Sequence, residues 1–387
     1  MGRLTAGAEV GGSCDARFAP VREALRENLA QRAEIGAAVA VIVEGTPVVD
    51  LWCGWADARR TRPWRHDTLV NAFSVGKALA GLCVLMLVSR GMLDLDETVC
   101  GRWPEFAAAG KEAVTVRQLL AHRAGLAAIG RALPEGALYR WDEVTGALAE
   151  QQPWWAPGSG HGYHVHTFGF LAGELVRRVS GEPIGVFLRR EVADALGAEL
   201  SFGLARAKRP RRAEYVFDAV RASGLQEARL ASDASLRERA YLNPPGAMGL
   251  GTVNTPAWQD AELPSANLHA DARGLARAYD ALIGGRPALL DPGVLREATR
   301  EASAGEDLVL GRPSRFGLGF QLTQPERPLG PNAGGFGHFG AGGSLAFADP
   351  HARVAFAYVM NHGGPQWRDP RNRALVDAVY DALARAS

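Results

Sequence analysis

Apolar runs with strand or helix spacing divide the chain into strands near both ends and helices between them. Near the N-terminus, the runs 38–43 and 47–52 flank the turn Glu44-Gly45-Thr46 and predict two strands. Near the C-terminus, the runs 343–349 and 354–360 flank a turn at Pro350 and predict two more strands. Helical spacing of apolar residues predicts helices over 19–33, 116–122, 168–179, 271–282 and 370–385.

This order of elements predicts an α/β fold of the α+β sandwich type. One antiparallel sheet is expected to form from both chain ends, with helices on its faces and a mostly helical lobe inserted. The 387 residues exceed what one hydrophobic core usually supports, so we expect two lobes. Residues 1–99 together with 260–387 are expected to form the lobe with the sheet, and residues 100–259 the helical lobe.

The most informative stretch is the apolar run 72–89, in which Lys77 is the only charged residue. Residues three apart on a helix lie on the same face, so Ser74 and Lys77 would be neighbours. Burial lowers the pKa of a lysine, and a neutral lysine can accept the proton of a serine hydroxyl. Ser74 is therefore a candidate nucleophile. From this stretch alone two alternatives stay open: a membrane span, which the central lysine disfavours, and a core helix whose lysine reaches the surface.

Charge and cysteine content narrow the class of protein. The chain has 43 Lys and Arg residues against 42 Asp and Glu residues, a balance that favours neither nucleic acid nor an anionic membrane as partner. The four cysteines show no metal-ligand spacing, and Cys53 and Cys83 lie in apolar runs. Residues 1–14 contain no apolar run of the kind found in a secretory signal. We therefore expect a cytoplasmic enzyme with free thiols.

Two glycine-rich segments place further polar side chains in unusual surroundings. Residues 157–167 carry Tyr163 in a loop that leads into a helix, and residues 334–344 carry His338 and lead into a strand. Closely spaced glycines permit close backbone approach, so N–H groups of the second segment could face a ligand. Tyr163 could equally be a core residue, and the second segment a surface loop.

Motifs of other catalytic classes are missing from the sequence. It contains no Gly-x-Ser-x-Gly, no His-Glu-x-x-His, no Walker loop and no Gly-x-Gly-x-x-Gly after a strand. His161, His164 and His166 are close together and could indicate a metal, but no acidic partner is near them. We expect no metal.

Taken together, these segments resemble the serine β-lactamase and penicillin-recognising superfamily, most of all its class C β-lactamases and family VIII carboxylesterases. Ser74-Val-Gly-Lys77 matches the Ser-x-x-Lys motif, Tyr163 the tyrosine of the Tyr-x-Asn motif, and His338-Phe-Gly340 the Lys-Thr-Gly position. The resemblance covers residues 20–385. It implies a β-lactamase/transpeptidase-like fold with the active site in the cleft between the two lobes.

The resemblance also implies roles for individual residues. Ser74 would form an acyl-enzyme, and Lys77, Tyr163 or the two together would accept its proton. The backbone N–H groups of Ser74 and Ala341 would form the oxyanion hole, and neither a metal nor an organic cofactor is needed. His338 would line the pocket and orient the substrate or the tyrosine. The other substrate-binding residues expected are Phe339, Gly340, His164, Val165 and Trp155, although Trp141, Trp154 and Trp155 could equally lie in the core.

Several activities share these residues. A carboxylesterase acting on small or aromatic esters is the first interpretation, with a small-molecule ester or acyl compound as its partner. An acyltransferase of specialised metabolism is the alternative, because the sequence does not show whether water is excluded from the acyl-enzyme. Val165 replaces the Asn of Tyr-x-Asn, which would bind a substrate amide, so weak β-lactamase or D-peptidase activity ranks lower. A non-catalytic acyl-binding sensor ranks last, and homo-oligomer formation stays open.

Overall fold

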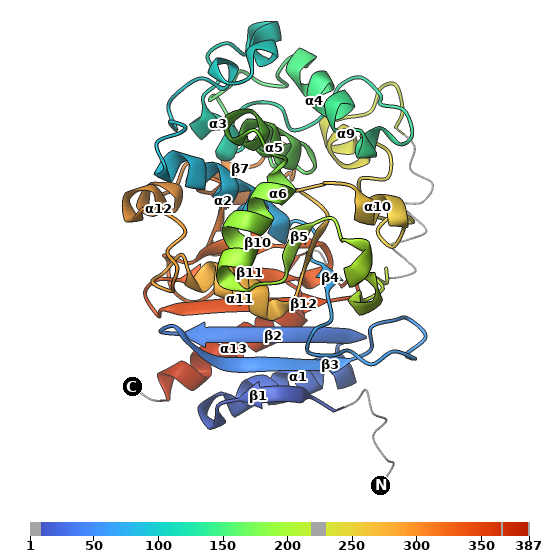
Figure 1. Cartoon of the computed structure of the whole chain (residues 1–387), viewed down its shortest axis with the longest axis vertical. Coiled ribbons are helices and arrows are strands. Elements are labelled where there is room, and N and C mark those ends of the chain that lie inside the picture. The colour runs from blue at the N-terminus through green and yellow to red at the C-terminus, as the bar shows by residue number, and fades with distance from the viewer. Residues whose placement is uncertain (1–8, 218–229, 365–366, 386–387) are drawn as a thin grey trace.

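A nine-stranded antiparallel sheet forms the base of the molecule in the computed structural model, which describes residues 9–217, 230–364 and 367–385 (Figure 1). The strands are β1 (Gly11–Cys14), β2 (Gly36–Val43), β3 (Thr46–Gly54), β4 (Val70–Asn71), β5 (Leu200–Phe202), β6 (Leu268–Ala270), β7 (Ser303–Glu306), β8 (Pro313–Phe316), β9 (Gln321–Leu322), β10 (Phe336–Phe339), β11 (Leu345–Asp349) and β12 (Val354–Met360). The helices are α1 (Ala19–Gln31), α2 (Val75–Ser89), α3 (Val116–Leu120), α4 (Trp141–Glu150), α5 (Thr167–Ser180), α6 (Ile184–Leu188), α7 (Asp194–Leu196), α9 (Leu236–Leu242), α10 (Pro256–Asp260), α11 (Ala272–Asp280), α12 (Pro292–Ala298) and α13 (Pro370–Ala384).

The two chain ends meet inside the large sheet. Its strand order is β1-β3-β2-β12-β11-β10-β9-β8-β7, and β2 pairs with β12 so that Val39 lies opposite Tyr358. Every residue of β12 is buried, as expected for a central strand covered on both faces. The predicted fold class, with one antiparallel sheet built from both chain ends, is therefore confirmed.

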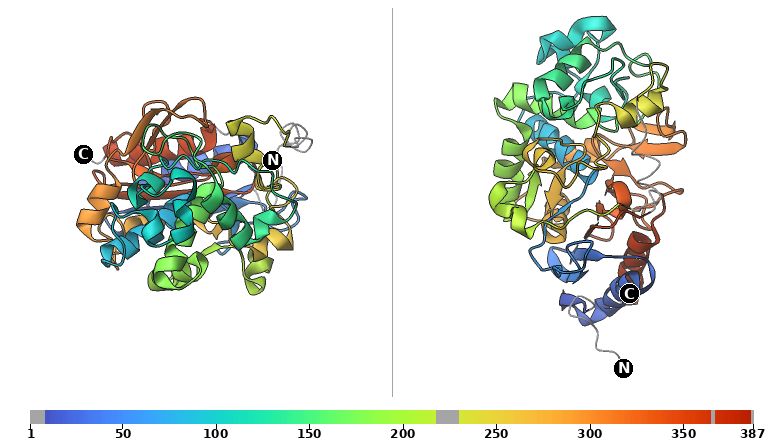
Figure 2. Two further views of the ribbon diagram at one scale, coloured as in Figure 1. Left: turned by 90° about the horizontal axis from the view of Figure 1, so that it is seen from above. Right: turned by 90° about the vertical axis from the view of Figure 1, so that its right-hand side faces the viewer.

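Helices cover both faces of this sheet. Helix α11 packs on β2, β11 and β12, whereas α1 pairs with α13 and contacts β3. The side view shows the sheet between these two helical layers (Figure 2). The core is continuous: it includes Val21 of α1, Leu275 of α11 and Val379 of α13, together with Leu119 and Phe168 from the helical region.

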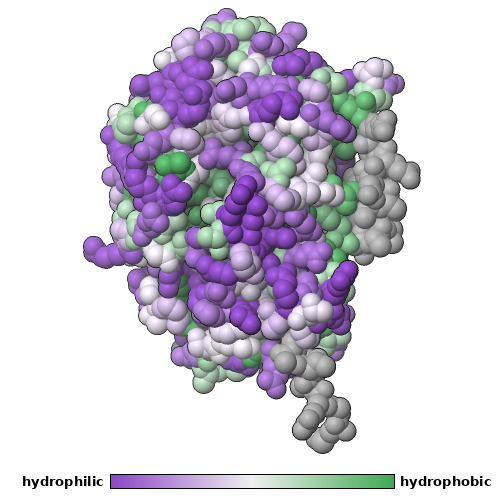
Figure 3. Space-filling view, turned by 45° about the vertical axis from the view of Figure 1, so that its right-hand side comes forward, coloured by the Kyte–Doolittle hydropathy of each residue, from purple (hydrophilic) through white to green (hydrophobic). Residues whose placement is uncertain are grey.

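Helix α2 lies in the middle of the molecule and packs against α5, α6 and β10. Residues 75–87 are all buried, because the run is apolar on every side and a helix of that kind needs neighbours all round. No described helix is long and apolar enough to cross a membrane. Hydrophilic side chains predominate on the face drawn in Figure 3, where hydrophobic ones form only small groups.

The structure differs from the sequence prediction at residues 334–344. Residues 336–339 form the strand β10 rather than a loop, and a tight turn at Ala341–Gly343 leads into β11. Gly337 makes this strand possible, because a Cβ there would lie 2.3 Å from the carbonyl oxygen of Ala346 on β11. A small second sheet of order β4-β6-β5 also joins the segment 100–259, which contains β5, to the segments on either side of it.

Candidate active site

Ser74 and Lys77 meet at the start of α2. Ser74 caps this helix and Lys77 lies in its first turn. Nζ of Lys77 is 3.0 Å from Oγ of Ser74 and 3.1 Å from the carbonyl oxygen of Ser265. Lys77 is fully buried, and burial lowers its pKa well below the ordinary value, with no carboxylate among the described residues to oppose this. The site therefore favours a neutral amine next to the serine hydroxyl.

A strained turn before α2 presents Ser74. Strand β4 ends at Asn71, and Phe73 has a φ of +49°, in the left-handed region that few non-glycine residues adopt. The Phe73 ring packs edge-on against Tyr215, with the ring centroids 4.8 Å apart. The chain thus turns sharply from strand to helix at a position braced by aromatic packing, and Ser74 stays partly exposed there.

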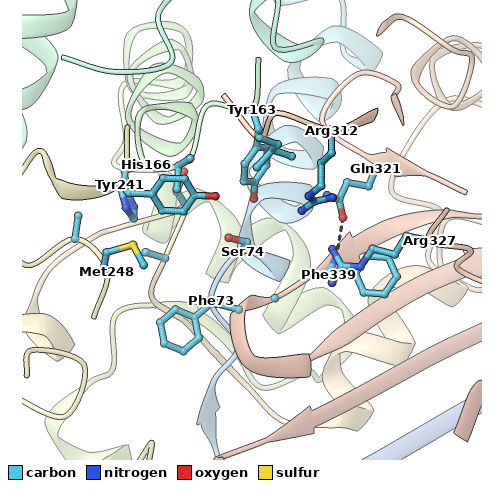
Figure 4. A pocket seen from close by; sticks show the side chains of 17 residues that line it. Phe73, Ser74, Tyr163, His166, Tyr241, Met248, Arg312, Gln321, Arg327 and Phe339 are labelled. Atoms are coloured by element: carbon cyan, nitrogen blue, oxygen red, sulfur yellow. Dashed lines mark hydrogen bonds between the residues drawn. The ribbon is translucent and has the colours of Figure 1, made fainter. Parts of the chain in front are cut away.

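Tyr163 lies beside Lys77 and points its hydroxyl group toward Ser74 (Figure 4). Nζ of Lys77 is 4.8 Å from the centroid of the tyrosine ring. The backbone N–H of Tyr163 donates to both carboxylate oxygens of Asp307 at 3.0 and 3.1 Å, and its ring stacks on Phe316. Burial raises the pKa of Tyr163, and hydrogen bonding with Ser74 opposes this only in part. The phenol is therefore protonated in the resting site.

Two backbone N–H groups in this region have no internal partner. Those of Ser74 and Ala341 have no acceptor within the described ranges, and both residues line one cavity. Gly340 permits their approach: a Cβ there would lie 2.4 Å from the carbonyl oxygen of Ala72, two residues before Ser74. Two free N–H donors beside a hydroxyl are what an oxyanion hole requires.

Side chains of α13 hold the carbonyl groups of the Ala341–Gly343 turn from behind. Nη2 of Arg371 donates to the oxygen of Gly342 at 2.6 Å, and Nδ2 of Asn372 donates to the oxygen of Gly343 at 2.8 Å. Arg371 is itself buried and is ion-paired with Asp369 at 2.7 Å. The turn is thus held by a buried polar network, which restricts the directions its N–H groups can take.

Ser74, Tyr163 and Ala341 line a cavity of about 720 Å³, counted with its open mouth. The segment 100–259 supplies one part of its lining, and the segments on either side of it supply the rest. The lining residues are Phe73, Ser74, Tyr163, Val165, His166, Tyr241, Ala247, Met248, Ser265, Ala266, Leu310, Arg312, Gln321, Arg327, Phe339, Gly340 and Ala341.

Three of the expected substrate-binding residues, His164, Trp155 and His338, do not line this cavity. His164 is fully buried, and its ring nitrogens are 3.2 Å from the N–H of Leu126 and 2.7 Å from the oxygen of Gly162, so it holds the loop together. Trp155 donates to the oxygen of Gly160 and packs edge-on against His164.

His338 also lies behind the cavity wall. It is buried, its Nδ1 is 2.7 Å from the oxygen of Phe339, and its ring is 6.0 Å from that of Tyr163. His338 is thus not among the residues that line the described cavity, and an orienting role toward Tyr163 stays a prediction. Trp141 and Trp154 do not line the cavity either; Val165, Phe339 and Gly340 do.

Sequence reasoning missed several cavity residues. His166 was considered only as a metal ligand, yet it lines the cavity, and no hydrogen bond of good geometry reaches its ring nitrogens within the described residues. Burial lowers its pKa to about 3, an effect that the Tyr241 backbone offsets only in part. Arg312, Gln321 and Arg327 lie on short strands and loops outside the motifs found in the sequence, so no sequence signal marks them. Within the described ranges, no group of His, Cys, Asp and Glu side chains is arranged to hold a metal ion.

Comparison with known proteins agrees with this geometry. The family model described as Beta-lactamase matches residues 21–381. Esterase/beta-lactamase LipL of Mycobacterium tuberculosis is 34% identical over 372 residues, which are 92% of this chain and 84% of LipL. The crystal structure of a family VIII carboxylesterase is 38% identical with a TM-score of 0.88, and the match covers 97% of this chain and 100% of that one. A penicillin-binding protein homologue from Caulobacter crescentus is 39% identical with a TM-score of 0.88, again covering 97% and 100%.

The fold and the site thus define a serine hydrolase of the β-lactamase type. The chain belongs to the beta-lactamase family, and the resemblance inferred from its motifs is confirmed. It is an enzyme whose relatives include carboxylesterases as well as β-lactamases.

Proposed function

We propose that the protein is a carboxylesterase that cleaves small or aromatic esters through an acyl-Ser74 intermediate. The observation that carries this proposal is the 3.0 Å distance between Oγ of Ser74 and Nζ of Lys77, a buried amine whose pKa is lowered by desolvation. A neutral amine at hydrogen-bonding distance can activate a serine hydroxyl. The names of LipL and of the family VIII carboxylesterase give independent support for ester substrates.

In the proposed acylation step, Oγ of Ser74 attacks the ester carbonyl carbon while its proton passes to Nζ of Lys77. The negative charge that develops on the carbonyl oxygen is stabilised by the N–H groups of Ser74 and Ala341. When the bond to the leaving alcohol breaks, the protonated phenol of Tyr163 gives its proton to the leaving oxygen and regains one from Lys77. Water then repeats the sequence on the acyl carbon and releases the acid and free Ser74.

Intact-mass measurement of the enzyme treated with short-chain p-nitrophenyl esters tests this proposal. We expect a single acyl adduct, located by peptide mapping on Ser74, and its loss in Ser74→Ala with the fold retained. An adduct on another residue, or near-normal turnover by Ser74→Ala, would overturn the proposal.

Water is the proposed acceptor, because it is abundant and needs no dedicated site. Product ratios should therefore change little when alcohols or amines are added at millimolar concentration. Saturable conversion of most acyl-enzyme to a new ester or amide would instead identify an acyltransferase, since a bound acceptor gains a large effective concentration.

Val165 is the basis for ranking esters above β-lactams and peptides. Its side chain lines the cavity and has no hydrogen-bonding group, so a substrate amide would be left without a partner there. We expect cleavage of p-nitrophenyl esters and at most slow turnover of cephalosporins, and Val165→Asn should shift this ratio toward the cephalosporin. A wild-type kcat/KM for a cephalosporin equal to that of the best ester would show that this interpretation of Val165 is wrong.

A further inference from the structure

One wall of the active-site cavity is rich in hydrogen-bond donors and positive charge. Figure 4 shows Arg312, Gln321 and Arg327 on one side of Ser74, facing an apolar and aromatic side. No aspartate or glutamate lines the cavity in the part of the chain that the structure describes. The proposed ester cleavage does not use these three residues.

Arg312 is held by an aromatic ring rather than by a carboxylate. Its guanidinium carbon lies 3.7 Å from the centroid of the Trp367 ring. The carboxylate that attracts it, Asp307, already accepts hydrogen bonds from the backbone N–H groups of Tyr163, Val309 and Leu310 and from a serine hydroxyl. The charge of Arg312 is thus left for a group that enters the cavity.

Arg327 lies deeper in the same wall. Its guanidinium carbon is 3.6 Å from the centroid of the Phe339 ring. Burial and the neighbouring charge of Arg312 lower its pKa to about 9, so it is still a cation at neutral pH. Two like charges close together in a partly buried wall repel each other, and a bound anion would relieve that repulsion.

Gln321 completes the wall. Its Oε1 accepts the backbone N–H of Phe339 at 3.0 Å, which leaves its Nε2 group as a donor (Figure 4). A second hollow of about 290 Å³ shares Arg312, Gln321 and Arg327 with the active-site cavity and continues to Trp367. These three residues therefore line both the active-site cavity and the hollow beside it.

We propose that Arg312, Gln321 and Arg327 bind a carboxylate of the substrate, so that the preferred substrates are esters that also carry a free carboxylate. This inference rests on the proposed function, because it names the substrate class of the Ser74 site. Guanidinium groups donate two parallel hydrogen bonds to the two oxygens of a carboxylate, a stronger and more directional contact than a neutral one. The free carboxylate can belong to the acyl group or to the alcohol.

Pairs of substrates in which an amide of similar shape replaces the free carboxylate test the inference. For the acyl side, the p-nitrophenyl monoester of glutaric acid is compared with the p-nitrophenyl ester of glutaramic acid. For the alcohol side, 4-acetoxybenzoate is compared with 4-acetoxybenzamide. In one of the two pairs we expect kcat/KM to be roughly tenfold or more higher for the carboxylate, the size typical of a hydrogen bond to a charged group. Equal values within both pairs would overturn the inference.

Variants then separate substrate binding from other effects of the arginines. Arg312→Gln should remove the preference for the carboxylate, so that kcat/KM falls roughly tenfold more for the charged ester than for its neutral counterpart, because the charged contact is lost. Arg296→Gln removes the same charge from an exposed position outside the cavity and should leave the preference intact. If the arginines act only on the ionisation of Tyr163, charged and neutral esters would lose rate equally, and the inference would be wrong.

A binding measurement keeps this test independent of turnover. Calorimetry on Ser74→Ala should detect tighter binding of 4-hydroxybenzoate than of 4-hydroxybenzamide, or of glutaramate than of glutaramide. The difference should shrink with added salt and disappear in Ser74→Ala/Arg312→Gln. Equal binding of acid and amide overturns the inference even if no ester is cleaved. Cleavage of neutral esters without any carboxylate preference overturns it while the proposed function stands.

Discussion

Lys77 shows how a single residue is tuned by its surroundings. Its only hydrogen-bond partners in the described structure are Oγ of Ser74 and the oxygen of Ser265. A buried charge without a carboxylate partner is unfavourable, so burial lowers the pKa of Lys77 and favours the neutral amine, which can act as a base. Lys111 is a useful contrast: it is also buried, but it donates to the carbonyl oxygens of Ala108, Ala149 and Gln151.

Substitution of Lys77 by an apolar residue of similar length should separate activity from stability. We expect Lys77→Met to lower kcat for a p-nitrophenyl ester by about 100- to 10,000-fold, the range for loss of a general base. Its Tm should equal or exceed that of the wild type, because no amine has to be desolvated on folding. Lys111→Met should do the reverse, keeping activity and lowering Tm, since three buried carbonyl groups lose their donor. Steady-state kinetics and thermal unfolding at pH 7 check both variants; a marked fall in Tm for Lys77→Met would contradict this account.

The lowered pKa of Lys77 also sets the sign of two pH dependences. Only the neutral amine accepts a proton, so acylation should be fully active above the lowered pKa and lost as pH falls through it. In the unfolded chain Lys77 has an ordinary pKa of about 10.4 and therefore binds a proton more tightly than in the folded chain. The free energy of unfolding of the wild type should therefore increase relative to that of Lys77→Met as pH rises toward that value. Chemical unfolding of the two proteins between pH 7 and pH 10 measures the gain, and a constant difference would argue against a neutral Lys77.

Lys77 and Tyr163 should behave as one proton-transfer unit. Burial lowers the pKa of the lysine and raises that of the tyrosine, so one is poised to accept a proton and the other to donate it. Groups that act together give non-additive losses, so Lys77→Ala/Tyr163→Phe should be little slower than the slower single variant. Phe keeps the ring that stacks on Phe316 and removes only the hydroxyl. Multiplicative losses in the measured kcat values would refute the coupling.

Among the secondary-structure elements, the turn between β10 and β11 is decisive. It approaches the turn before α2 so closely that a Cβ at Gly340 would lie 2.4 Å from the oxygen of Ala72. The buried Arg371 and Asn372 hold its carbonyl groups and prevent it from moving aside cheaply. The proposed chemistry thus depends on two turns, and Ser74 is the one side chain that these turns contribute to it.

Gly340→Ala should displace Ala341 relative to Ser74 and weaken the oxyanion hole. We expect kcat to fall by about 100- to 1000-fold with little change in KM, the effect of losing one backbone donor that acts mainly in the transition state. Gly334→Ala is the matched control, because Gly334 lies in the loop before β10 with no atom within 4 Å of its Cβ and should be neutral. Equal rates for the two variants would show that the close contact at Gly340 does not position the donors.

In the whole molecule, the candidate active site lies where segments that are far apart in sequence meet. The division into an α/β lobe of residues 1–99 and 260–387 and a helical lobe of residues 100–259 stays a proposal. It is supported by the position of the large sheet, whose strands all lie outside 100–259. However, one continuous core includes residues from all three segments, and β5 pairs with β6 across the proposed boundary.

We therefore expect the two proposed lobes to unfold together. Far-UV circular dichroism, tryptophan fluorescence and residual esterase activity should follow one coincident transition in urea, because neither lobe has a separate core. Loss of activity at clearly lower urea than loss of secondary structure would instead indicate that the lobes separate first.

How far the sequence predicts the molecule depends on the distance over which each feature is decided. The predicted helix over 19–33 and the predicted strand over 354–360 correspond closely to α1 and β12, because hydrophobic spacing is a local property. Strand β10 was missed, since its glycines are typical of loops and only pairing with β11 makes Gly337 suitable for a strand. His164 and Trp155 were placed in the substrate site because they are near Tyr163 in sequence, but the loop turns their side chains inward.

The sequence by itself determined the strand and helix pattern, the β-lactamase family, and the pairing of Ser74 with Lys77, because these rest on spacing over a few residues. Only the tertiary structure decided that Arg312, Gln321 and Arg327 share a wall with Ser74, since they are more than 200 positions away along the chain. It also decided that the pKa of Tyr163 is raised, because the pKa of a buried phenol depends on packing by every neighbouring element. Burial and long-range contact are properties of the folded chain, and no short stretch of sequence contains them.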